Sequence, residues 1–315
     1  MTLPLKPPIE PQLARGKPEL PLGEEWAYEP KYDGFRAIAF VDGNEIVLQS
    51  RGSKPLGRYF PELAFPSGRY VLDGEIVIDG SEAEEQDFGA LQQRIHPAES
   101  RIAMLAEQTP ARYIAFDLLA VDDESLLAEP LSERRSRLEG LRLVGIALTP
   151  WTLDPAQAEP WLARGEGVVA KDLRAPYRPG QRVGMVKVKR VRTIDAVVAG
   201  YRPGKDPGTV GSLILGLYDA DGSLHMVGHS SGLRAGEKRA LVEKLAPYET
   251  GDRGHGDPSR WKNEKELEWI SLRPELVVEV TFDHASGGRI RHGTKILRWR
   301  EDKAPGECRL EQMQS

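Results

Sequence analysis

The segment Glu29-Pro30-Lys31-Tyr32-Asp33-Gly34-Phe35-Arg36 follows strand-like residues and sets a lysine beside a carboxylate and a glycine. An amine attacks a phosphorus or carbonyl centre only when it is unprotonated, and the usual pKa of lysine is about 10.4. A nucleophilic Lys31 therefore requires burial, a neighbouring cation or a bound metal to favour the neutral form. Gly34 is expected to permit a tight turn. The alternative is an ordinary lysine at the corner of a hairpin, since Asp-Gly is a common turn dipeptide.

The composition is that of a folded protein with two domains. The chain has 315 residues, of which 40% are hydrophobic and 29% charged, and a formal net charge of −5. A nucleic-acid partner would then require positive charge to be gathered locally. Cys308 is the single cysteine, which excludes cysteine-based zinc sites and favours a reducing cytoplasm. The proline-rich start lacks a signal-peptide core, and no stretch approaches the roughly 20 apolar residues of a membrane span, so we expect a cytoplasmic protein without membrane contact.

The pattern of apolar residues divides the chain into three parts. Residues 1–24 are proline-rich and predict an extended N-terminal arm. Residues 25–192 mix strands and helices without regular alternation, which predicts an α+β domain with mixed or antiparallel sheets. Residues 193–315 contain short strands and one helix, which predicts an all-β OB-fold barrel. The predicted strands are 35–40, 45–49, 69–78 (one bent strand or two), 112–119, 167–170, 185–191, 195–201, 212–218, 224–228 and 276–282, and the predicted helices are 88–95, 97–107, 131–141 (with Ser132 as N-cap) and 233–245.

Three further segments carry groups suited to binding a phosphate, a sugar or a base. Ser50-Arg51 follows a strand and presents a cation, although an ordinary solvated loop arginine gives the same pattern. Glu75 lies in an apolar strand, where a buried carboxylate needs a hydroxyl, a metal or a cation as partner. A solvated glutamate on an edge strand is the alternative. Phe116 is either a core aromatic residue or a ring that stacks on a base.

Two later strands repeat this combination of apolar and charged residues. Glu166 precedes the apolar residues of Gly167-Val168-Val169-Ala170-Lys171, and Met185-Val186-Lys187-Val188-Lys189 sends two lysines to one face of a strand. Like charges at this spacing repel each other by about 0.2–1 kcal/mol at exposed sites. A polyphosphate between the lysines would reverse the sign of that effect. Taken alone, the pair is equally typical of solvated lysines on a surface strand.

The order of these segments resembles the motif set of the covalent nucleotidyltransferases, which comprise DNA ligases, RNA ligases and mRNA capping enzymes. The order is K-x-D-G-x-R, S-R, D-G-E, F-D-L, E-G-V-V-x-K and K-x-K, and 298–303 (R-W-R-E-D-K) looks like the R-x-D-K motif of the family's OB domain. The resemblance covers about Tyr28 to Lys303. The stretches 48–51, 58–62 and 87–95 further resemble the small bacterial ATP-dependent DNA ligases of the LigC type, which are relatives of the ligase module of LigD.

This resemblance implies a nucleotidyltransferase (adenylation) domain and a three-step reaction. Lys31 attacks the α-phosphorus of ATP to give lysyl–AMP, the AMP passes to the 5′-phosphate of a nick, and the 3′-hydroxyl displaces it to seal the strand. The other residues implied are Lys187 and Lys189 at the α-phosphate; Glu29, Arg36, Glu75, Phe116 and Glu166 at the nucleotide; Glu166 and Glu75 at Mg²⁺ or Mn²⁺; Asp33 near the 3′-hydroxyl; and Ser50, Arg51 and Arg36 at the DNA.

The resemblance also implies a role for the C-terminal motif. Arg300, Asp302 and Lys303 would reach the pyrophosphate of ATP after the barrel closes about a hinge at Arg192-Thr193. The positive charge expected of an acidic DNA-binding protein gathers here, at Arg289, Arg291, Lys295, Arg298, Arg300 and Lys303. The expected partners are nicked duplex DNA and a repair or end-binding protein, with the enzyme acting in DNA repair as a monomer.

Two alternatives stay open on the sequence alone. An RNA ligase or GTP-using capping enzyme would share the first motifs, because these handle ribose and phosphate rather than the base. A non-catalytic nucleic-acid-binding protein could retain the scaffold, although binding needs no nucleophilic lysine. An NAD-dependent ligase is disfavoured, since that class adds a cysteine-ligated zinc module and this chain has one cysteine.

Overall fold

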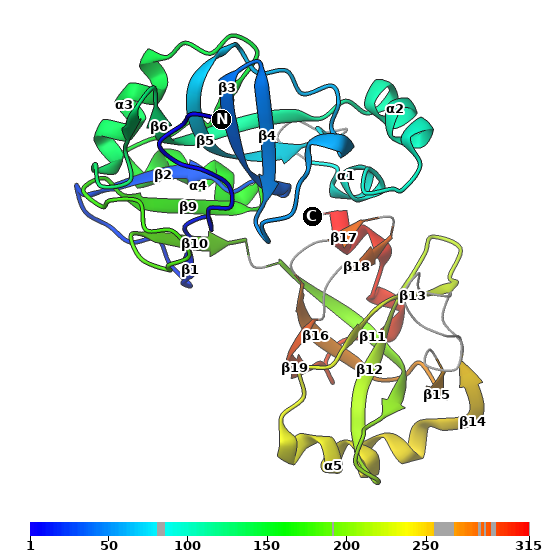
Figure 1. Cartoon of the computed structure of the whole chain (residues 1–315). Helices are drawn as coiled ribbons and strands as arrows, with labels where there is room; N and C mark the ends of the chain where they lie inside the picture. The colour runs from blue at the N-terminus through cyan, green and yellow to red at the C-terminus, as the bar shows by residue number, and fades with distance from the viewer. Residues whose placement is uncertain are drawn as a thin grey trace. The chain divides into compact units, whose positions relative to one another are not determined.

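The computed structural model describes residues 1–80, 86–190, 192–254, 268–282, 285–286, 288–290 and 294–314. Arg291, which belongs to the basic run noted above, lies outside these residues. Contacts between Cα atoms divide the chain into two units, Met1–Arg190 and Val191–Ser315. The division lies two residues before the boundary expected from the sequence. Each unit is described by itself (Figure 1).

The first unit contains two sheets. Its strands are β1 (Arg15–Gly16), β2 (Trp26–Pro30), β3 (Phe35–Gly43), β4 (Glu45–Ser50), β5 (Gly68–Val77), β6 (Arg112–Val121), β7 (Glu124–Ser125), β8 (Ala147–Leu148), β9 (Gly167–Asp172) and β10 (Met185–Lys189). One sheet has the order β1-β10-β9-β2, and the other has the order β4-β3-β5-β6-β7 with β8 beside β6. The short strand β1 pairs in parallel with β10, and the short strand β8 pairs in parallel with β6. Strands β3, β4, β5 and β6 pair with one another in antiparallel order. The predicted mixture of parallel and antiparallel strands is confirmed.

Local sequence explains three strands of the larger sheet. Strands β3 and β4, which correspond to the predicted strands 35–40 and 45–49, form a hairpin in which Asp42 pairs with Glu45 across a two-residue loop. Gly43 has a φ of 66°, a conformation that glycine adopts readily. Strand β5 is a single strand with register shifts against β6 after Val71 and Asp73, so the bent-strand alternative is the correct one.

The helices of the first unit are α1 (Phe88–Gln93), α2 (Glu99–Gln108), α3 (Leu131–Gly140) and α4 (Pro155–Ala163), with a 3₁₀ turn η1 (Gly57–Tyr59). The prediction of Ser132 as the N-cap of α3 is wrong, because Pro130 holds that position without a side-chain bond. The first amides of α3 donate instead to the carbonyls of Leu173 and Ala175. The Asp154 carboxylate caps α4, a helix that the sequence analysis missed.

Three apolar clusters hold the first unit together. The largest lies on the six-stranded sheet and includes Leu72, Ile76 and Leu91 of α1. A second joins the four-stranded sheet to α4 through Val168 and Ala158. A third packs the start of the chain, with Leu3 only 2% exposed, against Phe40 and its neighbours in β3. The N-terminal residues therefore cover one face of the larger sheet.

Among the described residues, the second unit contains a curled seven-stranded sheet and a separate two-stranded sheet formed by β17 and β18. Its strands are β11 (Arg192–Pro203), β12 (Val210–Tyr218), β13 (Leu224–Ser230), β14 (Glu249–Gly254), β15 (Trp269–Leu272), β16 (Val277–Phe282), β17 (Ala285–Ser286), β18 (Arg289–Ile290) and β19 (Lys295–Trp299), and its helices are α5 (Ala235–Leu245), η2 (Ala246–Tyr248), η4 (Pro305–Glu307) and η5 (Leu310–Gln314). Strand β11 pairs with β12, β15 and β16 in turn, and its irregular register bends the sheet. This architecture fits the predicted OB fold.

Strand β14 and the strands β15 and β19 were not predicted. The residues of β14 are polar and almost wholly exposed, so they carry no apolar alternation. Among the residues that the structure describes, no helix is long and apolar enough to cross a membrane.

Candidate active site

Lys31 lies where the chain passes from one sheet of the first unit to the other. Strand β2, which ends at Pro30, pairs with β9 in the four-stranded sheet, while β3, which begins at Phe35, pairs with β4 and β5 in the six-stranded sheet. The Lys31 amide donates to the Gly167 carbonyl at 2.9 Å, which anchors the crossing to β9. The hairpin alternative is therefore wrong.

Gly34 permits a close approach rather than a tight turn. Its φ lies outside the left-handed region, so the expected turn conformation is absent. A Cβ at this position would overlap the carbonyl oxygen of Ile76 and lie 2.7 Å from Cγ of Glu75. Glycine thus lets the segment that carries Lys31 lie directly against β5, where Glu75 is placed.

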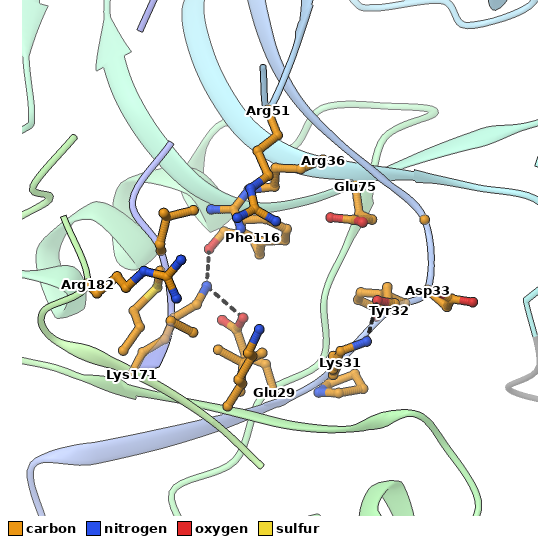
Figure 2. A pocket seen from close by; sticks show the side chains of 17 residues that line it. Glu29, Lys31, Tyr32, Asp33, Arg36, Arg51, Glu75, Phe116, Lys171 and Arg182 are labelled. Carbon is orange, nitrogen blue, oxygen red and sulfur yellow. Dashed lines mark hydrogen bonds and ion pairs between the residues drawn. The ribbon is translucent and has the colours of Figure 1, made fainter. Parts of the chain in front are cut away.

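A pocket of about 250 Å³ opens beside Lys31 within the first unit (Figure 2). It is lined by eight predicted site residues: Glu29, Lys31, Asp33, Arg36, Arg51, Glu75, Phe116 and Lys187. It is also lined by residues to which the sequence assigned no role, among them Leu13, Ala14, Lys171 and Arg182. Residues as far apart as Leu13 and Lys187, which are separated by 174 positions in the sequence, are therefore gathered around one cavity.

One wall of the pocket is cationic. Burial lowers the pKa of Lys187, and the positive charges of Lys189, Lys31, Arg51 and Arg182 lower it further. The Nζ of Lys31 donates to the carbonyl of Tyr32 at 3.3 Å, and its side chain faces the cavity in Figure 2. Such a concentration of repelling cations is stabilised when a polyanion binds among them. The wall is therefore suited to a polyphosphate.

Arg36 is held rigidly at another side of the pocket. Its Nε and Nη2 donate to the two carboxylate oxygens of Asp73, each at 2.6 Å. Burial acts to lower the pKa of Arg36, but the charge and hydrogen bonds of Asp73 outweigh burial and raise it. The guanidinium carbon lies 4.5 Å from the ring centroid of Phe116. Arg36 is thus charged and fixed before any ligand binds.

Glu75 is the predicted carboxylate on β5, and it faces Arg36 across the β3–β5 ladder. Burial raises the pKa of Glu75 to about 7, although the charges of Arg36 and Lys31 oppose that shift. A carboxyl group of this kind is poised between its two forms near neutral pH. It can accept hydrogen bonds from ligand hydroxyls when it is ionised.

The deep end of the pocket contains a buried ion pair. Lys171 Nζ lies 2.7 Å from Oε2 of Glu29, and both side chains are 4% exposed. Lys171 also donates to the carbonyl of Phe116 at 3.3 Å and lies over the ring of that residue, as Figure 2 shows. Burial raises the pKa of Glu29, while Lys171 and then Arg135 act to lower it. The other carboxylate oxygen of Glu29 is buried without a hydrogen-bond partner.

Three predicted site residues of the first unit lie outside the pocket lining. Ser50 uses its hydroxyl to accept the Lys54 amide and so shapes the turn that presents Arg51. Glu166 immediately precedes Gly167, whose carbonyl holds Lys31. Lys189 pairs with Gly167 at the same end of the four-stranded sheet. Lys189 and Glu166 are thus neighbours of the Lys31 segment rather than parts of the cavity wall.

The C-terminal motif forms an ion-pair network inside the second unit. Arg300 donates to both carboxylate oxygens of Asp302, at 2.9 and 2.8 Å, and to Asp195 at 2.8 Å. Lys303 lies 3.5 Å from the same Asp195 carboxylate. The side-chain hydrogen bonds from Arg300 lower the pKa of Asp302 to about 2, and the charge of Arg300 acts in the same direction. The three predicted residues are therefore brought together, around an aspartate that the sequence analysis did not select.

The site residues that the sequence analysis missed differ in how clearly local patterns indicate them. Lys171 stands in an apolar strand within a motif already quoted, so its burial could have been questioned. Arg182 is in a loop, and Asp195 lies within β11, a strand of ordinary composition. Asp73 is the first residue of the D-G-E motif, but it was assigned no role. Their partners are distant in the sequence, and local patterns do not report such pairs.

Two family models match the chain. The ATP dependent DNA ligase domain matches residues 18–189, and the ATP dependent DNA ligase C terminal region matches residues 206–303. The chain belongs to the ATP-dependent DNA ligases. In this ligase the residues that line the pocket lie in the first matched region except for Leu13 and Ala14, and Arg300, Asp302 and Lys303 lie at the end of the second.

Curated relatives resemble the ligase over its whole length. It is 46% identical to DNA ligase C1 of Mycolicibacterium smegmatis, over 99% of this chain and 96% of the relative. It is 42% identical to DNA ligase C of Mycobacterium tuberculosis, over 100% of this chain and 96% of the relative. The family suggested by the motif order is confirmed.

Solved structures resemble the ligase in both units. The ligase domain of M. tuberculosis LigD is 28% identical, with a TM-score of 0.52 over 95% of this chain and 97% of that chain. A mycobacterial DNA ligase D complexed with ATP and MES is also 28% identical, with a TM-score of 0.53 over the same shares. These structures support a nucleotidyltransferase domain followed by an OB fold.

Proposed function

We propose that this ATP-dependent DNA ligase seals 3′-hydroxyl/5′-phosphate nicks in duplex DNA through an AMP bound covalently to Lys31. The observation that carries the proposal is the position of Lys31 in a pocket whose wall holds Lys187, Arg51 and Arg182. A nucleophilic amine surrounded by cations is suited to attack on a phosphate.

The first step uses these groups in two ways. The neutral Nζ of Lys31 forms a bond to the α-phosphorus of ATP, the bond from that phosphorus to the bridging oxygen breaks, and pyrophosphate leaves. The nitrogen loses one proton to solvent and keeps the other in the phosphoramidate. Lys187, with Lys189 nearby, balances the negative charge that develops on the α-phosphate.

The adenosine would occupy the other side of the pocket. Phe116 offers a ring for the base, and Glu75 offers a carboxylate for the ribose hydroxyls. The unpartnered oxygen of Glu29 is suited to accept from the amino group of adenine, while Lys171 holds that carboxylate in place. Arg36 would contact the ribose or the nick. Arg51 and Ser50 would contact the DNA, and Asp33 would lie near the 3′-hydroxyl.

Mg²⁺ is the metal that we propose for the reaction. Among the described residues, no group of three or more His, Cys, Asp or Glu side chains is arranged to hold a metal ion. A site with few protein carboxylates is suited to Mg²⁺, which is usually bound by one or two carboxylates together with substrate phosphates. Glu166 and Glu75 are the proposed carboxylates, and Mn²⁺ has the same ligand preferences. The bound metal would neutralise charge on the phosphates of ATP.

The second unit and the setting of the enzyme complete the proposal. Arg300, Asp302 and Lys303 would act on the pyrophosphate part of ATP, so they would matter for the first step only. We place the enzyme in the cytoplasm as a monomer in DNA repair, with nicked duplex DNA as substrate and a repair or end-binding protein as partner.

The proposal is tested by incubating the protein, freed of bound AMP, with ATP labelled at the α-phosphate and Mg²⁺. We expect an acid-labile label on the protein that is absent from Lys31→Ala, and sealing of nicked DNA but not of nicked RNA. Absence of the label from wild-type protein would contradict the mechanism. Preferential sealing of RNA would support the RNA-ligase alternative, and DNA binding without any label would support a non-catalytic binding protein.

A further inference from the structure

The N-terminal arm reaches the wall of the pocket. Strand β1 of the arm pairs with β10 opposite Val186 and Lys187, and the amide of Lys17 donates to the Lys187 carbonyl at 3.0 Å. Leu13 and Ala14, which precede β1, line the cavity. A segment that only covered the apolar core would end at Leu3 and its neighbours. The arm therefore has a second place of contact, at the nucleotide site.

Gln12 forms a closed ring of hydrogen bonds with three residues of the domain. The main-chain amide of Gln12 donates to Oη of Tyr177 at 2.9 Å, and the Tyr177 hydroxyl donates to Oδ2 of Asp73 at 2.6 Å. Asp73 holds Arg36 by two bonds of 2.6 Å, and Arg36 Nη2 donates back to the Gln12 carbonyl at 3.3 Å. The ring runs through the arm, the segment before β10, strand β5 and strand β3.

Three of the four members of this ring are buried, and the Tyr177 hydroxyl keeps its proton. Gln12 is 3% exposed, Tyr177 2% and Asp73 0%. Burial and the charge of Asp73 raise the pKa of Tyr177 well above its usual value, so the hydroxyl remains a donor at neutral pH. Removing one member leaves the others with unsatisfied groups in a region that water does not reach. The ring thus determines where the guanidinium of Arg36 lies.

The side chain of Gln12 anchors the loop that carries a second pocket cation, Arg182. Its Nε2 donates to the Val183 carbonyl at 2.5 Å, and its Oε1 accepts the Arg178 amide at 2.9 Å. The amide of Leu13 donates to the Gln181 carbonyl at 2.8 Å in the same loop. These bonds bracket Arg182, which lines the pocket. The arm therefore braces both Arg36 and the loop of Arg182.

We propose that the N-terminal arm is a working part of the active site, in which Gln12 and Tyr177 are positioning residues that hold Arg36 and the Arg182 loop in their binding arrangement. They do so before ATP or DNA arrives, which lowers the entropic cost of ordering these cations around the substrate. The proposal rests on the function given above for the pocket and on the role of Arg36 in it.

The first test is a double-mutant cycle between Tyr177→Phe and Arg36→Lys. It measures the single-turnover rate of adenylation and the rate of sealing a pre-adenylated nick. Of the two half-reactions, Tyr177→Phe should slow by about tenfold the one that Arg36→Lys affects more strongly. In the Arg36→Lys background, Tyr177→Phe should change the rate of that half-reaction by less than twofold. The matched control is Tyr70→Phe, since Tyr70 is also 2% exposed and donates to a single carbonyl, that of Pro66, away from the ring. The control should leave both rates within twofold of wild type.

Gln12→Ala provides the second variant, because it removes the bonds to Val183 and Arg178 while leaving the main-chain groups. We expect a raised KM for ATP, with thermal unfolding still cooperative and the assay run well below the transition. Additive effects of Tyr177→Phe and Arg36→Lys, or equal loss in Tyr177→Phe and Tyr70→Phe, would overturn the proposal and leave the arm a structural cover. A wild-type enzyme that forms the Lys31 adduct in the same assay shows that the proposed function stands even if the arm proposal fails.

Discussion

The two units place their charged functional groups in opposite ways. In the first unit, Lys171 and Glu29 form an ion pair in which each side chain is 4% exposed, and Asp73 beneath Arg36 is wholly buried. In the second unit, Arg300 shares its guanidinium between Asp195 and Asp302, and the Asp302 side chain is 66% exposed. Buried pairs are expensive to break, whereas surface pairs exchange partners readily. We therefore expect the first unit to hold a ligand in one arrangement, and the exposed Asp302 of the second unit to exchange its partner more readily.

The largest expected effect comes from breaking the buried pair. Lys171→Met leaves the Glu29 carboxylate buried with only Arg135 nearby, at 4.0 Å. We expect the free energy of unfolding to fall by about 3–5 kcal/mol, measured by urea denaturation. Adding Glu29→Gln should restore part of that loss.

The comparison in the second unit is Arg298→Met. Arg298 pairs with Glu279 at the surface, with 63% of the Arg298 side chain exposed, so the loss should stay below about 1 kcal/mol. Equal losses in Lys171→Met and Arg298→Met would remove the distinction between the two units.

The second effect separates two lysines of the same strand. Lys187 lines the pocket, whereas Lys189 is exposed and lies outside its lining. Lys187→Ala should slow the formation of the Lys31 adduct by about 10²–10³-fold, as expected for losing a preorganised charge at a reacting phosphate. Lys189→Ala should cost less, and rapid-quench measurement with labelled ATP compares the two. A larger loss for Lys189→Ala would show that the cavity wall is not where the α-phosphate binds.

These contrasts also show what the sequence could and could not predict. The motif residues Lys31, Glu75 and Lys187 are found from residue type and order, because each chemistry-bearing group stands in a short, recognisable local pattern. The crossing of the chain at Lys31 between two sheets could not be predicted, since the pairing of β2 with β9 joins residues about 140 positions apart. An Asp-Gly dipeptide suggested a hairpin because local propensity carries no information on that pairing.

The same limit explains the residues that support the site. The burial of Lys171 depends on its ion pair with Glu29. Arg300 likewise has Asp195 as its partner, which lies 105 positions earlier. Ser132 was selected as a cap because serine is typical of that position, yet the Leu173 and Ala175 carbonyls already satisfy the first amides of α3. Where a tertiary contact replaces a local one, single-sequence patterns give the wrong partner.

The third effect is the pH dependence that Glu75 contributes. The unfolded carboxyl releases its proton near its usual pKa of 4.5, and the folded one near pH 7, because burial raises the pKa. Between these values the folded protein binds the extra proton, so the stability falls as pH rises. Glu75→Gln should remove this loss, which is at most about 3 kcal/mol. Urea denaturation at pH 5 and pH 8 measures it, with the exposed Glu99→Gln as control, and parallel pH profiles for wild type and Glu75→Gln would contradict the assignment.

The smallest effect is expected where the charges already lie at the surface. Asp302→Ala removes two of the hydrogen bonds of Arg300 and leaves Asp195 as its remaining carboxylate partner. Because pyrophosphate leaves in the first step, adenylation of Lys31 should slow by about tenfold, equal to about 1.4 kcal/mol, while sealing of a pre-adenylated nick stays within twofold. The adjacent exposed Glu301→Ala is the control and should change neither rate. Equal loss in both half-reactions would mean that the network stabilises the second unit as a whole, and the contrast between fixed and exchangeable charges would then rest on the first unit alone.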